Sequence, residues 1–195
     1  MVFNKATKQA FVHPPKTGTH TTQNFLKAIG WKTLPMTHAR TERLIRDYPN
    51  LNDYTLYGFL RDPLLRFESV ILHLKRMFGV HPIFEKVLRD NGVTDSLEAV
   101  SYETVISVFP KMAEALPAFC HQQAAWLNHP KVTVLDFRNM EAELRRITGN
   151  NEQPLVRYNT STDFGRSVIT PAVEEFVRQQ YADDYVLASK IGLEF

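Results

Sequence analysis

The stretch QAFVHPPKTGTHTTQNFLKAIG, residues 9–30, carries the pattern that decides the fold class. It opens with a short apolar run, Gln9 to Val12, which predicts a strand. The two prolines that follow cannot continue a central strand, so the chain must turn there. A loop is expected at residues 16–19. Apolar side chains at helical spacing then predict a helix from Thr21 to Ile29, with the last glycine of the stretch as its stop.

The same order of strand, loop and helix recurs along the rest of the chain. A strand rich in aromatic residues is predicted from Tyr54 to Leu60, and the following Asp62-Pro63 pair is a strong start for a helix. A third strand is predicted from Val132 to Leu135. Helices are predicted at residues 140–147, over most of residues 80–127 with a capping-box pattern at residues 95–98, and from Thr170-Pro171 onward.

Strands that alternate with helices predict an α/β fold with a central, mostly parallel sheet covered on both faces. The 195 residues show no repeat and no linker, and they fit a single domain over residues 1–195. In such sheets ligands bind beyond the carboxyl ends of the strands. The loops that follow the predicted strands are therefore the places to look for chemistry.

Composition excludes several classes of protein. Net charge is only +2, so binding to nucleic acid through bulk charge is not expected, although a few cations suffice for a small anion. The single cysteine, Cys120, excludes an intrachain disulfide and a cysteine metal cluster, and we expect it to be buried. No signal peptide and no apolar run of about 20 residues is present, so we expect a cytoplasmic protein without a membrane span, or a soluble piece of something larger.

The loop after the first strand has the ingredients of an anion cradle. Gly18 lets the backbone approach a ligand, threonines at positions 17, 19 and 21 offer hydroxyls, and the next helix presents free N–H groups. Lys16 adds a positive charge. The order differs from the nucleotide-triphosphate loop, in which the lysine follows the second glycine. The alternative is a solvated polar turn.

The junction after the second strand offers a second anion site. Arg61 ends a predicted buried strand, where a guanidinium needs an anionic partner. Ser69 lies eight residues further on, about two helical turns, and faces a similar side. Together the two side chains can hold a phosphate. In the alternative interpretation Arg61 pairs with an acidic residue of the chain and Ser69 is incidental.

The two junctions together resemble the sulfotransferase family, in particular its carbohydrate-sulfotransferase branch. Residues 15–19 resemble the family's 5′-phosphosulfate loop, although Thr19-His20 stands where small residues usually follow the glycine. Arg61-Asp62-Pro63, with Arg66 and Ser69, resembles its 3′-phosphate motif. Weaker similarities follow in the expected order: His121-Gln122, Asp136, Glu141, Asn159, Ser161, Tyr181, Asp184 and Tyr185.

The resemblance implies a three-layer α/β sandwich with the P-loop-like sulfotransferase fold. It implies 3′-phosphoadenosine 5′-phosphosulfate as the donor and an acceptor hydroxyl, with a glycan or a small hydroxylated metabolite favoured. By resemblance, the 5′-phosphosulfate would be held by Lys16, Thr17, Gly18, Thr19, His20 and Thr21. Arg61 and Ser69 would bind the 3′-phosphate, and Arg166 is a further candidate contact to the nucleotide.

The expected reaction needs a cation at the leaving oxygen and a base at the acceptor. Lys16 is the predicted cation. His38 is the first choice for the base, because imidazole suits proton transfer near neutral pH and a histidine recurs at about this place in relatives. His20 is the second choice and Glu68 the third. The remaining histidines show no metal-ligand spacing, and no metal is expected.

Two other functions remain open at this stage. One is a small kinase-like phosphotransferase that uses ATP, although the order of its loop residues differs and no magnesium-binding carboxylate follows the first loop. The other is a non-catalytic protein that binds a phosphorylated nucleotide, because a donor site and a catalytic base are separable.

Overall fold

The computed structural model describes residues 1–36, 38–76, 82–93, 99–158 and 168–195. The predicted capping box and Arg166 lie outside these residues. The chain divides into two compact units. Unit 1 comprises Met1–Asp62, Gln123–Thr160 and Val186–Phe195, and unit 2 comprises Pro63–Gln122 and Ser161–Tyr185. Whether the two units form the predicted single domain over residues 1–195 stays a prediction.

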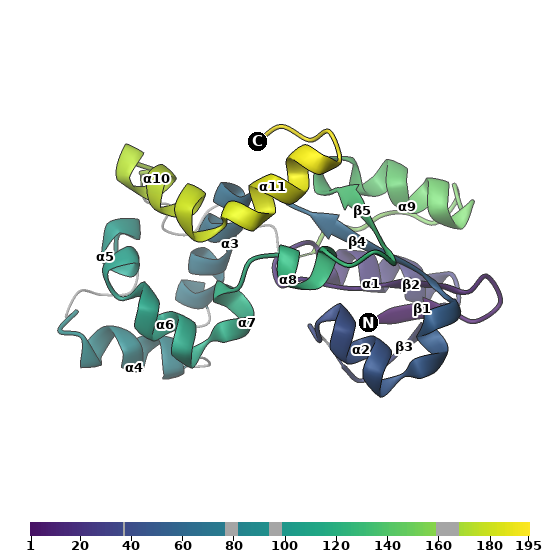
Figure 1. Ribbon diagram of the computed structural model, residues 1–195, viewed down its shortest axis with the longest axis horizontal. Coiled ribbons are helices and arrows are strands. Elements are labelled where there is room, and N and C mark those ends of the chain that lie inside the picture. Colours follow the sequence, from purple (N-terminus) through teal and green to yellow (C-terminus); the bar gives the residue numbers. More distant parts are fainter. Residues whose placement is uncertain (37, 77–81, 94–98, 159–167) are drawn as a thin grey trace. The chain divides into compact units, whose positions relative to one another are not determined.

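Unit 1 contains a five-stranded sheet in the order β3-β1-β2-β4-β5 (Figure 1). The strands are β1 (Val2–Asn4), β2 (Gln9–Phe11), β3 (Lys32–Thr33), β4 (Thr55–Leu60) and β5 (Val132–Asp136). β2, β4 and β5 run parallel to one another, as predicted. β1 pairs antiparallel with both β2 and β3. The α/β class is confirmed, but the sheet is mixed rather than mostly parallel, because the turn from β1 to β2 is too short for a crossover.

Helices cover both faces of the sheet. Side chains of β4 alternate, so that Leu56 and Leu60 pack on one face while Tyr57 and Phe59 pack on the other. The first face is covered by α2 (Thr41–Asp47), α8 (Ala124–Leu127) and the part of α11 (Ala182–Lys190) that belongs to unit 1. The second face is covered by α1 (Thr19–Ala28) and α9 (Met140–Thr148). The predicted covering of both faces is therefore confirmed.

Unit 2 is helical in the residues that the structure describes. It holds α3 (Pro63–Arg76), α4 (Pro82–Asp90), α5 (Tyr102–Ser107), α6 (Phe109–Ala115), α7 (Pro117–Cys120), α10 (Pro171–Gln180) and the start of α11. Its core includes a group of aromatic rings, with Phe109 5.0 Å from Phe176 and 6.4 Å from Tyr181 between ring centres. Cys120 is buried there, as predicted, and burial raises the pKa of its thiol to about 12. Such a thiol is inert.

Most predicted elements form within two residues of their expected bounds. α3 begins at Pro63, as its start signal predicted, whereas α1 begins at Thr19, two residues early, because Gly18 takes a left-handed conformation and starts the helix. The final helical stretch is two helices that meet at Tyr181. Two short 3-10 helices, η1 (Pro49–Asp53) and η2 (Phe137–Asn139), precede β4 and α9.

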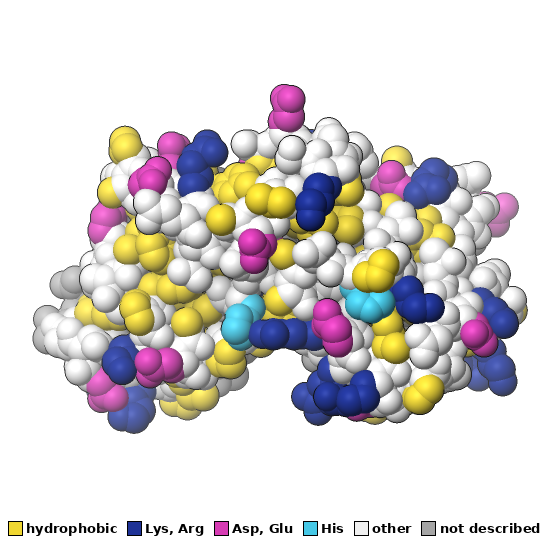
Figure 2. Space-filling model, in the orientation of Figure 1, with side chains coloured by type: hydrophobic (Ala, Val, Ile, Leu, Met, Phe, Trp, Pro, Cys, Tyr) yellow, Lys and Arg dark blue, Asp and Glu magenta, His cyan; other side chains and the backbone are white. Residues whose placement is uncertain are grey.

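The surface mixes charges of both signs. Figure 2 shows basic and acidic side chains interspersed over the face that it presents. This agrees with the small net charge of +2. Within the described ranges, no helix combines the length and the apolar character that crossing a membrane requires.

Candidate functional site

The carboxyl ends of β2, β4 and β5 lie at one edge of the sheet, because these three strands are parallel. The loop at residues 13–18 follows β2, Arg61 follows β4, and Phe137 follows β5. One guanidinium nitrogen of Arg61, Nη1, donates a hydrogen bond to the Lys16 carbonyl at 3.1 Å. The Arg61 guanidinium also lies 5.0 Å from the centre of the Phe137 ring. The structure thus brings the predicted loop and the predicted arginine together.

The loop has a tightly constrained backbone. Lys16 and Gly18 both adopt left-handed conformations, with φ of 69° and 73°. For a lysine this conformation costs about 1–2 kcal/mol, so surrounding contacts must hold it. The Arg61 bond to the Lys16 carbonyl is one such contact, and the Thr17 hydroxyl, which donates to the Pro14 carbonyl at 2.8 Å, is another. Left-handed residues in a turn can direct successive N–H groups toward one anion.

Gly18 has a structural role beside the predicted approach to a ligand. A Cβ at this position would collide with the Met140 side chain and would lie 3.0 Å from the Phe137 ring. The left-handed φ also disfavours any other residue there. Gly18 is therefore required by the packing of α1 against η2 and α9, independently of any bound molecule.

Three threonine hydroxyls were predicted to face the anion, and the structure distinguishes them. The Thr17 hydroxyl is bonded to Pro14, and the Thr21 hydroxyl accepts the Tyr158 N–H at 3.1 Å. The Thr19 hydroxyl is buried and has no hydrogen-bond partner among the described residues. A buried hydroxyl without a partner costs free energy, roughly 1–3 kcal/mol. The Thr19 hydroxyl is thus the one of the three that remains available to a polar ligand, as far as the described residues show.

The first turn of α1 has features that favour a negative charge nearby. The helix is ten residues long, begins without a side-chain cap, and has no acidic residue in its first turn. Its free N–H groups and dipole favour an anion. Lys16, which is half-buried, and Arg61 add two positive charges at the same loop. The arrangement can bind phosphate or sulfate oxygens.

His38 lies in the same unit, beside the start of the loop. Its Nδ1 is 2.8 Å from the His13 carbonyl oxygen. A carbonyl only accepts, so Nδ1 must carry the proton, and a neutral His38 then has its lone pair at Nε2. The backbone of His38 is also left-handed, with φ of 62°. A histidine fixed in this tautomer can act as a base through Nε2.

His13 is a buried histidine at the base of the loop. It is 3% exposed, and its Nε2 has no partner among the described residues. Burial, followed by the positive charges of the amino terminus, His38 and His20, holds the pKa of His13 well below its ordinary value. His13 is therefore neutral at pH 7. His20, the second candidate base, is exposed on α1. No group of three potential metal-binding side chains occurs among the described residues.

The other predicted residues lie in unit 2, on α3. Ser69 and Glu68 are buried, and the Tyr102 hydroxyl donates to Glu68 at 3.2 Å. Arg66 is wholly buried, donates to the Phe119 carbonyl at 3.3 Å and lies over the Tyr181 ring. Arg66 is thus part of the core of unit 2, although it falls within the motif that resembles a 3′-phosphate site. The roles of Ser69 and Glu68 stay predictions.

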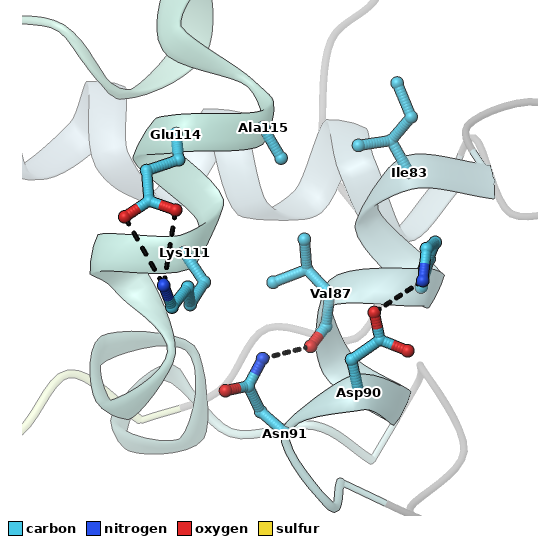
Figure 3. Close-up of a pocket in the computed structure, with 8 residues that line it drawn as sticks. Ile83, Val87, Asp90, Asn91, Lys111, Glu114 and Ala115 are labelled. Atoms are coloured by element: carbon cyan, nitrogen blue, oxygen red, sulfur yellow. Dashed lines mark hydrogen bonds and ion pairs between the residues drawn. The ribbon is translucent and has the colours of Figure 1, made fainter.

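Unit 2 also has a pocket of about 560 Å³ between α4 and α6 (Figure 3). Its charged side chains are paired: Lys86 with Asp90 at 2.6 Å, and Lys111 with Glu114 at 3.3 Å. Val87 and Ile83 supply apolar lining. None of the predicted site residues lines this pocket, and its paired charges offer no anion site.

The sequence analysis missed residues that support the site. Gln123, Trp126, Phe137 and Met140 all contact the loop residues, Arg61 or His38. Gln123 and Trp126 lie within residues 80–127, which were predicted to be mainly helical, and belong to no motif of their own. Both side chains are buried, and a buried polar group needs a hydrogen-bond partner. Only the folded chain shows this burial.

Neither the protein-family models nor the curated proteins supply a relative of this chain. The resemblance to the sulfotransferase family therefore rests on the two strand–helix junctions and stays a prediction.

Proposed function

We propose that this chain is a sulfotransferase that binds 3′-phosphoadenosine 5′-phosphosulfate and transfers its sulfuryl group to an acceptor hydroxyl. The observation that carries the proposal is the Thr19 hydroxyl at the start of α1, which is buried and has no hydrogen-bond partner in the part of the chain that the structure describes. It lies in the first turn of a helix whose loop also carries Lys16, with Arg61 bonded to that lysine's carbonyl. A phosphosulfate oxygen would supply the missing partner and would meet the positive end of the helix.

The reaction is an in-line displacement at sulfur. The acceptor oxygen forms a bond to sulfur while the bond from sulfur to the 5′-phosphate oxygen breaks. The acceptor proton passes to Nε2 of His38, the nitrogen left unprotonated when Nδ1 donates to His13. Lys16 stabilises the charge that builds on the leaving phosphate. The products are a sulfate ester and adenosine 3′,5′-bisphosphate.

The other parts of the proposal follow the resemblance. The fold would be the P-loop-like three-layer sandwich of sulfotransferases, and the location cytoplasmic. The acceptor would be a glycan or a small hydroxylated metabolite. By the same resemblance, Arg61 and Ser69 would bind the 3′-phosphate. Because Arg61 also holds the Lys16 carbonyl, an Arg61→Ala variant should lose affinity for nucleotides with and without a 3′-phosphate.

Ligand-induced stabilisation separates this proposal from its alternatives. Adenosine 3′,5′-bisphosphate should raise the melting temperature of the chain, and ATP with magnesium should not. The reverse result would favour a kinase-like enzyme. Transfer of labelled sulfuryl groups to a panel of hydroxyl acceptors then distinguishes an enzyme from a binding protein, since a binding protein gives no transfer.

Thr19→Val tests the observation itself, because valine keeps the shape of threonine and removes the hydroxyl. The free energy of unfolding of the ligand-free variant should equal or exceed that of the wild type, since a buried group without a partner is lost. Affinity for adenosine 3′,5′-bisphosphate should fall about 10-fold or more, as expected for a hydrogen bond to a charged group. Thr22→Val, which changes a buried hydroxyl one turn further along α1, is the control. Unchanged affinity in Thr19→Val would overturn the proposed anion site.

A further inference from the structure

Gln123 forms a two-point contact with the backbone of Arg61. Its side-chain oxygen accepts the Arg61 N–H at 2.9 Å, and its side-chain amide donates to the Arg61 carbonyl at 2.7 Å. This happens one residue beyond the end of β4, whose ladder with β5 finishes at Leu60. Gln123 is wholly buried. The Gln123 amide thus extends the hydrogen bonding of β4 by one residue. It thereby fixes the backbone of Arg61, from which the guanidinium side chain extends.

Trp126 holds the segment that carries His38. Its indole N–H donates to the His38 carbonyl at 2.9 Å, and its own carbonyl accepts the Thr41 hydroxyl. The Arg40 guanidinium lies 5.9 Å from the centre of its ring. Three contacts therefore fix residues 38–41 against one buried tryptophan, and they do so where His38 has a left-handed backbone.

Gln123 and Trp126 belong to the same short element. The Gln123 carbonyl accepts the N–H groups of Trp126 and Leu127, so Gln123 begins α8. Leu127 packs against β4 where Gly58 leaves room for it, since a Cβ on Gly58 would collide with the leucine. α8 is thus anchored to the strand that ends at Arg61, and both side chains point to candidate site residues of unit 1.

We infer that α8 is the positioning element of the site, in which Gln123 sets Arg61 and Trp126 sets His38. The inference rests on the proposed function for the roles of Arg61 and His38, but the contacts that position them are present in the ligand-free chain. Through Arg61, Gln123 also acts on the Lys16 carbonyl, and so on the shape of the anion loop. Through His38, Trp126 acts on the ring that bonds the His13 carbonyl. The two residues should therefore affect different steps: anion binding and proton transfer.

Substitution of Gln123 should change nucleotide binding. Gln123→Leu removes both hydrogen bonds, and the dissociation constant for adenosine 3′,5′-bisphosphate, measured by calorimetry, should rise roughly 10-fold. Gln123→Glu keeps the acceptor and loses the donor. Its affinity, compared with the wild type at the same pH, should recover as the pH falls and the carboxyl gains a proton that can donate to the Arg61 carbonyl. Gln179→Leu, a change at an exposed glutamine on α10 in unit 2, is the control.

Substitution of Trp126 should change His38. Trp126→Phe keeps an aromatic ring and removes the N–H that holds the His38 carbonyl. The imidazole resonances of His38 in the ligand-free chain should shift, and transfer of labelled sulfuryl groups should slow roughly 10- to 100-fold, as expected for a misplaced catalytic group. The dissociation constant for adenosine 3′,5′-bisphosphate should stay within about twofold. Trp31→Phe, a change at another buried tryptophan, controls for lost packing.

The outcomes separate this inference from the proposed function. A wild-type chain that fails to bind adenosine 3′,5′-bisphosphate defeats the proposed function, while the His38 resonances still test Trp126. A wild-type chain that binds, with Gln123→Leu equal to it in affinity, overturns the role of Gln123. Unshifted His38 resonances in Trp126→Phe overturn the role of Trp126. If Trp126→Phe does not fold, Thr41→Val, which removes the hydrogen bond from the Thr41 hydroxyl to the Trp126 carbonyl, must shift the same resonances.

Discussion

Lys16 combines a cationic side chain with a left-handed backbone, φ 69°, at the start of the candidate site. We predict that Lys16→Ala lowers the rate of sulfuryl transfer by about 10²–10³ and changes donor affinity far less, because its charge is used mainly as the leaving group forms. Single-turnover kinetics with labelled donor, beside calorimetry with adenosine 3′,5′-bisphosphate, measures both quantities.

Backbone strain offers a control for this prediction. Lys16→Gly relieves the left-handed strain. It should still lower the transfer rate by the same factor as Lys16→Ala, because both variants lack the ammonium group. Lys8→Ala changes another left-handed lysine, in the turn between β1 and β2, and should keep the wild-type rate. A Lys16→Ala enzyme with a near-normal rate would remove Lys16 from the mechanism.

The buried His13 should make the stability of the ligand-free chain depend on pH. Its folded-state pKa lies well below the ordinary value of about 6.5, so the unfolded chain binds the proton first as the pH falls. Stability is therefore fully present above about pH 6.5 and declines below it, by at most about 1.4 kcal/mol per pH unit, until the folded-state pKa is reached.

Urea unfolding at a series of pH values tests this contribution. His13→Phe removes the ionisation and keeps an aromatic ring beside Phe11, so the free energy of unfolding should fall less steeply with acid than in the wild type. His129→Gln, which changes a histidine outside the group formed by His13, His20 and His38, is the control. The free energy of unfolding of His13→Phe could instead fall as steeply below about pH 6.5 as that of the wild type. Burial of a neutral His13 would then not be the cause of the pH dependence.

At the scale of an element, the start of α1 depends on Gly18. We predict that Gly30→Ala costs about 1–2 kcal/mol of unfolding free energy, because Gly30 has a left-handed φ and open space around it. Gly18→Ala should cost more, because its Cβ would also collide with Met140. Chemical denaturation of both variants gives the comparison.

The excess cost at Gly18 can be assigned by a double-mutant cycle. When Met140 is already alanine, adding Gly18→Ala should cost little more than Gly30→Ala does. An equal cost for Gly18→Ala with and without the Met140 side chain would contradict the packing role of Gly18.

The elements that the sequence predicts well are those with runs of apolar residues. β2, β4 and β5 have such runs, and Asp62-Pro63 marks the start of α3. β1 (Val2–Asn4) and β3 (Lys32–Thr33), by contrast, lie in no stretch that the sequence predicts as a strand, and their antiparallel pairing depends on neighbours in the folded sheet. This is why a mostly parallel sheet was expected and a mixed one is found.

The candidate site divides in the same way. Residues 16–21 and Arg61 could be predicted because they follow strand ends, where ligands bind in α/β folds. The sequence does not reveal that the Thr17 and Thr21 hydroxyls form hydrogen bonds within the chain, or that the Thr19 hydroxyl has no partner among the residues with described structure. Nor does it reveal Gln123 and Trp126, whose bonds to Arg61 and His38 span 62 and 88 residues. Burial of Arg66 is likewise a property of the folded unit 2.

At the scale of the whole molecule, charge predicts which anions can bind. The net charge is +2, and basic and acidic side chains are interspersed on the face in Figure 2. Proteins bind duplex DNA through many lysine and arginine contacts with its phosphates, whereas a small anion needs only a few fixed hydrogen-bond donors. Under the proposed function, Lys16 and Arg61, which are joined by a hydrogen bond from the Arg61 guanidinium to the Lys16 carbonyl, would supply the second kind of site.

We therefore predict that the chain binds adenosine 3′,5′-bisphosphate but not duplex DNA at about 0.15 M salt, where the Debye length of about 8 Å screens scattered surface charges. Fluorescence anisotropy with a labelled duplex should give no binding tighter than roughly 10⁻⁴ M, the weak end of non-specific affinity. Nucleotide binding should persist at that salt, because its contacts are hydrogen bonds from one preformed loop. Micromolar binding of the duplex would mean that a basic surface outside this loop governs which anions the protein takes.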